Sequence, residues 1–169
     1  MTNDIAKFVQ GIARDAWSSG VDPGSLQSIR WISLFGARDH EYPQIGLSHE
    51  AQWVVASVGG VTRISIDSAA WLLALDYSLK ELRSIIQRKF GSFSEAADVL
   101  PYERIVEHGL EYGNDVGILK AVAWLEEDRG LMTERLKGLL ARISYDRKYS
   151  QAVRHRALKL VAPLRRHSH

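Results

Sequence analysis

The amino-acid sequence predicts an all-α protein, and three kinds of observation support this fold class. Apolar residues recur at spacings of three and four along most of the chain, which is the period of a helix with one buried face. Capping residues and glycine or proline stops separate these segments at short intervals. The one stretch with a strand-like composition is 61–66, and it has no evident partner strand. We therefore expect about eight to ten helices, packed as antiparallel pairs in a compact bundle or a short superhelix.

The N-terminal part of the chain is predicted to be helical up to the strand-like stretch. Asp22-Pro23 is a strong start signal, because an N-cap acceptor precedes a proline at the first helical position. Residues 39–47 contain proline and glycine and indicate a loop. Ser48 is the next expected cap, and Gly59-Gly60 stops the helix that follows it. The helices expected here cover residues 3–20, 22–38 and 48–58.

The C-terminal part of the chain carries the clearest helix boundaries. Ser78 and Glu81 form a capping box, in which each side chain satisfies a backbone N–H that has no partner within the helix. Asn114, Thr133 and Ser150 each precede an apolar stripe and are expected to act as N-caps. Whether residues 61–66 form a strand or an extended connector is open. The helices expected here cover residues 67–75, 78–91, 94–100, 101–113, 114–130, 133–143 and 150–164.

Charge is divided unevenly along the chain. Residues 129–169 contain 11 Lys/Arg against 2 Asp/Glu, a local charge of +9, while residues 1–128 contain 11 against 18 and carry −7. The net charge of +2 hides this division. Such an asymmetry indicates a charged partner more than buried chemistry.

Acidic side chains follow one face of the helix predicted at 101–113 and gather at the end of the next one. Like charges four residues apart cost about 0.2–0.5 kcal/mol per pair, and acids at a helix C-terminus oppose the macrodipole. A chain that tolerates both costs is expected to keep these acids for a cationic partner. The alternative is that the basic C-terminal helices satisfy them within the fold. The candidate partner-binding residues are Glu103, Glu107, Glu111, Asp115, Glu126, Glu127 and Asp128.

The basic C-terminal segment is the second candidate surface. A cluster of cations could hold phosphates, and Tyr145 and Tyr149 could stack on bases. The segment could equally dock on the acidic face within the molecule. The candidate phosphate-binding residues are Arg147, Lys148, Arg154, Arg156 and Lys159.

Several helical stretches carry a resemblance to a known family. The stretches are Leu82-Arg83-Ser84-Ile85-Ile86, Leu100-Pro101-Tyr102, Leu119-Lys120-Ala121-Val122 and the helix from Ser150 to Val161. Together they resemble the helical, partly HEAT-like immunity proteins of bacterial toxin–immunity pairs. The resemblance implies a non-catalytic cytoplasmic inhibitor whose acidic face neutralises a basic toxin, such as a nuclease, with no cofactor. Charge complementarity in such a pair speeds association and sets specificity.

Other function classes find little support in the motifs. The chain has no cysteine, which excludes disulfides, thiolate catalysis and Cys-based metal sites. No histidine pair has ligand spacing, so we expect no metal and no enzyme activity. A nucleic-acid-binding protein that uses the basic segment remains an alternative. So does an enzyme or ligand-binding domain with a pocket near Trp53 and Trp71.

The expected organisation is simple. At 169 residues, the chain is long enough for one domain with a real core, and we take residues 1–169 as that domain. No stretch approaches the roughly 20 apolar residues that span a bilayer. The polar N-terminus argues against a secretory signal, so we expect a cytoplasmic location and no membrane partner.

Overall fold

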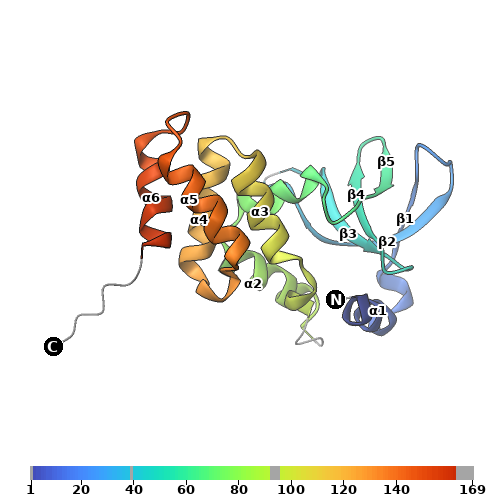
Figure 1. The fold of residues 1–169 in the computed structure, drawn as a ribbon. Coiled ribbons are helices and arrows are strands. Elements are labelled where there is room, and N and C mark those ends of the chain that lie inside the picture. The colour runs from blue at the N-terminus through green and yellow to red at the C-terminus, as the bar shows by residue number, and fades with distance from the viewer. Residues whose placement is uncertain (1, 39, 92–95, 163–169) are drawn as a thin grey trace.

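A curled antiparallel sheet lies beside a layer of helices in the computed structural model, which describes residues 2–38, 40–91 and 96–162 (Figure 1). The all-α prediction is therefore wrong for the N-terminal part of the chain. The sheet has five strands in the order β1-β2-β3-β4-β5, and every neighbouring pair is antiparallel. The strands are β1 (Ser18–Val21), β2 (Ser28–Gly36), β3 (Gln44–Ser48), β4 (Trp53–Ser57) and β5 (Gly60–Arg63).

The segments predicted as helices at 22–38 and 48–58 contain strands β2 and β4 instead, and much of both faces of these two strands is buried. One face packs on the helices through residues such as Ile32 and Trp53, while Trp31, Val54 and Val61 belong to a separate small core. A strand that is buried on both faces shows a run of apolar residues instead of alternation. In β2 that run also matches a helical spacing, which is why the pattern alone gave the wrong element.

Curling of the sheet creates the small second core by bringing β1 close to β5. Gly20 on β1 faces Val61 on β5, and a Cβ on Gly20 would lie 2.3 Å from Val61 Cγ2. The sheet is therefore nearly closed on itself, as a short barrel would be. The cluster inside the curl is Ile29, Trp31, Val54, Ala56 and Val61.

Two side chains that look like helix caps instead form the turns of this sheet. Asp22 Oδ1 accepts a hydrogen bond from the Gly24 backbone N–H at 3.3 Å, and Ser25 donates to Asp22 Oδ2 at 2.7 Å. Ser48 Oγ accepts from the backbone N–H groups of Glu50 and Gln52. Asp and Ser stabilise turns and helix starts by the same kind of bond, so the residue type does not separate the two.

The remaining N-terminal predictions are corrected in the same way. The predicted loop 39–47 includes most of β3, and the helix expected at 3–20 is divided. Its parts are α1 (Thr2–Gly11), the 3₁₀ helix η1 (Arg14–Ala16) and β1. The strand-like stretch 61–66 does contribute a strand, β5, whose partner is β4. The predicted helix at 67–75 is the 3₁₀ helix η2 (Ala69–Asp76).

The C-terminal helices form where the sequence predicts them. Ser78, Asn114, Thr133 and Ser150 all cap helices by accepting a backbone N–H, as expected. The start of the helix predicted at 94–100 and the end of the helix predicted at 150–164 lie outside the described residues. These elements are α2 (Leu79–Lys89), η3 (Ala96–Val99), α3 (Tyr102–Tyr112), α4 (Asp115–Glu127), η4 (Arg129–Leu131), α5 (Glu134–Tyr145) and α6 (Gln151–Val161).

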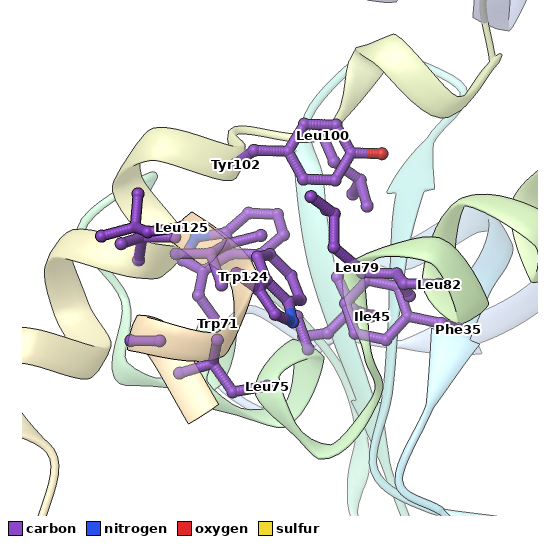
Figure 2. Close-up of a cluster of buried hydrophobic side chains, with 14 of the residues drawn as sticks. Phe35, Ile45, Trp71, Leu75, Leu79, Leu82, Leu100, Tyr102, Trp124 and Leu125 are labelled. Carbon is purple, nitrogen blue, oxygen red and sulfur yellow. The ribbon is translucent and has the colours of Figure 1, made fainter. Parts of the chain in front are cut away.

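The main core lies where the sheet meets the helices (Figure 2). Trp71 from η2 is fully buried and packs edge-to-face on Trp53 from β4, with ring centroids 4.8 Å apart. Trp124 from α4 is also buried, and its Nε1–H donates to the Tyr77 carbonyl at 2.9 Å. Helical pairs thus build only the C-terminal part of the molecule, and the predicted HEAT-like superhelix is not formed. Trp53 and Trp71, near which the sequence allowed a pocket, are both buried in this core.

Candidate functional site

Glu107, at the middle of the predicted acidic stripe, is buried inside the helical layer. It lies on α3, its side chain is only 7% exposed, and it forms ion pairs with Arg104 and Arg135. Arg104 lies on the preceding turn of the same helix, whereas Arg135 comes from α5. The carboxylate therefore joins α3 to α5 and is not free to meet a partner.

Two of the three neighbouring acids on this side of the molecule, Glu111 and Asp115, also have partners within the fold. Arg135 Nη2 lies 3.4 Å from Glu111 Oε1. Asp115, the first residue of α4, accepts a hydrogen bond from the Ser150 backbone N–H at 3.1 Å and so holds the N-terminus of α6. Glu103 is exposed and has no ion pair among the described residues.

The acidic cluster that ends α4 connects this helix to two others. Glu126 accepts two hydrogen bonds from the guanidinium group of Arg156 on α6, one from Nε to Oε1 at 3.2 Å and one from Nη2 to Oε2. Glu127 accepts the Lys80 backbone N–H at 3.1 Å and so helps to cap α2. Asp128 pairs with Arg83 of α2 at 2.9 Å. The acidic and basic segments therefore meet inside the fold, which answers a question the sequence left open.

Asp128 gives this network a measurable pH dependence. The Arg83 guanidinium, and next the Gly130 backbone N–H, hold the pKa of Asp128 below its ordinary value of 3.8. Because the pKa is lower in the folded state, the contact stabilises the protein fully above pH 3.8 and is lost as pH falls through the lowered pKa. We expect Asp128→Asn to reduce the free energy of unfolding by about 0.2–1 kcal/mol at neutral pH, since both partners are partly exposed.

Urea unfolding at a series of pH values tests this prediction. The stability gap between the wild type and Asp128→Asn should close on the acid side of pH 3.8. In a double-mutant cycle with Arg83→Gln, the coupling free energy between Arg83 and Asp128 should fall to zero over the same acid pH range. A gap that stays constant across the acid range would show that the Arg83–Asp128 contact does not contribute.

The predicted basic residues fall into two groups in the structure. Arg156 is bound to Glu126, and Lys148 lies 3.4 Å from Asp146. Arg147 and Lys159 are exposed and have no ion pair among the described residues. Arg154 is half-buried, and its Nε has no hydrogen-bond partner among the described residues.

A set of cations and tyrosines converges where α5 ends and α6 begins, and we name it the basic tip. A cleft of about 360 Å³ at this end of the helical layer is lined by residues of α3, α5 and the α5–α6 loop, among them Tyr112, Arg142, Lys148 and Tyr149. Figure 1 shows this loop beside the turn between α3 and α4. The basic tip consists of Tyr112, Arg142, Tyr145, Arg147, Lys148, Tyr149 and Arg154.

The electrostatics of the basic tip favour an anion. The Lys148 backbone N–H, bonded at 3.0 Å, lowers the pKa of Asp146, which therefore stays ionised and holds the Lys148 ammonium. Glu111 is held by Arg135. Arg142 and Arg147 have no carboxylate partner among the described residues, so they carry the positive charge that is free to act.

Two of the three tyrosine side chains at the basic tip are highly exposed. Tyr112 is 68% exposed and Tyr145 is 78% exposed, while the Lys148 ammonium lies 4.7 Å from the centre of the Tyr149 ring. Sequence reasoning identified Tyr145 and Tyr149 but missed Tyr112, since α3 is far away along the chain. The signal that could have found it is its position at a helix end, before the Gly113-Asn114 turn.

Searches for a metal site and for similar proteins give no further information about the basic tip. No group of three or more His, Asp or Glu in the described part of the chain could hold a metal ion. Among the described residues, no helix has both the length and the apolar character required to cross a membrane. Comparisons of the chain with protein-family models, with curated proteins and with solved structures gave no match.

Proposed function

We propose that this protein binds single-stranded nucleic acid through the basic tip. One observation carries the proposal. Arginines that have no carboxylate partner among the described residues lie at the same end of the helical layer as highly exposed tyrosines. Proteins that bind single strands combine a positive surface along the backbone with aromatic rings on which bases stack. The proposed activity is binding and requires no catalytic step.

Each part of the basic tip has a defined task in this proposal. Arg142 and Arg147 neutralise phosphates, and Arg154 adds a cation on the first turns of α6. Tyr145 offers an open ring to bases, and Tyr112 offers the ring face that is turned away from His108, whose ring centroid lies 5.4 Å from that of Tyr112. An extended, flexible strand can follow such a surface, because its bases are not already stacked in a duplex.

The acidic face gives weaker support to the inhibitor hypothesis than its spacing indicated. Of its seven candidate residues, the six other than Glu103 already hold a cation or a backbone N–H. A basic toxin that used these acids would have to break contacts that hold the helices together. Inhibition of a basic partner stays a prediction, and the basic tip is the surface on which we base the proposal.

Fluorescence anisotropy with a labelled oligothymidylate tests the proposal. We expect binding that weakens steeply with salt, because each neutralised phosphate releases counterions. Replacing Arg142, Arg147 and Arg154 by Gln should weaken binding and make the logarithmic salt slope shallower by about 2, at roughly 0.7 per lost phosphate contact. Tyr145→Leu should cost about 1–3 kcal/mol of binding free energy without changing the salt slope.

The matched control removes the same charge elsewhere. Arg14, Arg30 and Arg88 belong to η1, β2 and α2, which are separate from α5 and α6 (Figure 1), and their replacement by Gln should leave binding nearly unchanged. Heparin serves as a polyanion without bases, so Tyr145→Leu should not affect its binding. Equal losses from both triple variants would place binding outside the basic tip. Absence of binding to oligothymidylate at low salt would refute the proposed function.

A further inference from the structure

A second cleft lies at the opposite end of the molecule, between α1, the sheet and the end of α2. Its volume is about 310 Å³, at the lower end of the range for small-ligand sites. Phe8 of α1 packs edge-to-face on Phe90, with ring centroids 5.2 Å apart, and this contact fixes α1 beside α2. The lining residues are Ile12, Ala13, Ala16, Ser18, Ile32, Ser33, Lys89 and Phe90.

Small side chains keep this cleft open over an apolar floor. Ile12, Ile32 and Phe90 supply the apolar surface, while Ala13 and Ala16 leave room above it. The pairing of β2 with β3 shifts register between Ser33 and Phe35, so β2 carries a bulge at the cleft. Bulges redirect side chains and occur often beside binding sites.

Among the described residues that line this cleft, Lys89 is the only ionised group. It has no carboxylate partner among the described residues, and its side chain stays accessible to solvent. The walls of the cleft desolvate its ammonium and lower the pKa of Lys89. A partly desolvated ammonium with no counterion gains free energy when an anion is placed beside it.

We propose that this cleft binds a small carboxylic acid with an apolar body, whose carboxylate pairs with Lys89. The apolar body would cover Ile12, Ile32 and Phe90, and the hydroxyls of Ser18 and Ser33 can hydrogen-bond the carboxylate end. The charge of Lys89 selects an anion, and the apolar floor selects a chain or ring over a bare ion. This inference is independent of nucleic-acid binding at the basic tip.

Octanoate and 1-octanol are matched probes, since they share an apolar chain and differ in charge. Titration of ¹⁵N-labelled protein, followed by amide chemical shifts, should show octanoate perturbing residues 12–18, 32–33 and 89–90. Octanoate should bind about tenfold more tightly than 1-octanol, as expected for one charge-assisted contact at a partly exposed site. Lys89→Met should remove this preference and leave the binding of 1-octanol unchanged.

Two further variants keep the test decisive. Lys80→Met removes a lysine from the other end of α2 and should bind octanoate as the wild type does. Ala16→Trp should fill the cleft and abolish the binding of both probes. The proposal is overturned if octanoate and 1-octanol bind equally well, if Lys89→Met keeps the preference, or if the perturbed amides lie elsewhere. Absence of octanoate binding overturns it as well, whatever the outcome with oligothymidylate.

Discussion

Replacing Trp71 by Ala should lower the free energy of unfolding by about 3–5 kcal/mol, as large-to-small substitutions of buried aromatic residues do. Trp71 has no exposed surface, packs edge-to-face on Trp53 and donates its Nε1–H to the Ser65 carbonyl at 3.2 Å. The substitution leaves a cavity where the sheet meets the helices (Figure 2). It also removes one of the two hydrogen bonds that the Ser65 carbonyl accepts, the other coming from the Ser68 backbone N–H. Domains of this size are stable by about 5–15 kcal/mol, so Trp71→Ala should remove a large part of the total.

Urea unfolding followed by far-UV circular dichroism measures this effect. Trp71→Phe keeps an aromatic ring against Trp53 and should cost clearly less than Trp71→Ala. Tyr145→Ala is the matched control, because the ring is 78% exposed and its loss should change stability by about 0.5 kcal/mol or less. A loss below about 1 kcal/mol for Trp71→Ala would mean that Trp71 does not hold the sheet on the helices.

The same unfolding curves report whether the sheet and the helices unfold together. The main core is continuous from Trp53 on β4 through Trp71 to Trp124 on α4. A shared core predicts one cooperative transition, with the same midpoint by circular dichroism and by tryptophan fluorescence. Two separate transitions would show that the sheet and the helices are stable independently.

The helices of the C-terminal part could be predicted because each has one buried face and a local start signal. Ser78 and Asn114 cap helices that carry their apolar residues on a single stripe, and both features can be found without knowing the fold. The strands could not be identified in this way, because the curl of the sheet buries much of both faces of β2, β3 and β4. Val54 lies inside the curl and Trp53 faces the helices, so neighbouring positions on β4 are both apolar.

The candidate binding surfaces could be predicted only in part, because the sequence does not show which side chains from different helices meet. The spacing of Glu103, Glu107 and Glu111 correctly placed them on one helix, yet it could not reveal Arg135, which comes from another helix. Like-charge repulsion along α3 is thus relieved by a cation that only the tertiary fold supplies. The basic tip depends on the same kind of packing, since Tyr112 and Arg142 line one cleft only because α3 lies beside α5.

Removing both cations around Glu107 should be far more damaging than removing Glu107 itself. Its carboxylate is 7% exposed, whereas the side chains of Arg104 and Arg135 are 39% and 62% exposed. Without Glu107 both guanidinium groups can still be hydrated, but without them the carboxylate is left buried and unpaired. We expect Arg104→Gln with Arg135→Gln to cost about 3–5 kcal/mol, the penalty for an uncompensated buried charge.

Glu107→Leu should cost no more than about 1 kcal/mol, because an apolar side chain of similar size suits a buried position and the charge is removed with it. The two arginines also contact Asp67 and Glu111, but these solvent-accessible pairs contribute little. Adding Glu107→Leu to the double arginine variant should therefore restore most of the lost stability, and chemical denaturation measures each step.

The ranking of these variants separates a structural Glu107 from a partner-binding one. If Glu107 serves only to join α3 to α5, stability is lost only in the variant that leaves the Glu107 carboxylate buried without a cation. The triple variant is then more stable than the double variant. If Glu107→Leu alone costs as much as the loss of both arginines, the carboxylate contributes favourably in its own right and the explanation from desolvation is wrong. Recovery in the triple variant would assign Glu107 to the fold and leave Glu103 as the acid on α3 without an ion pair among the described residues.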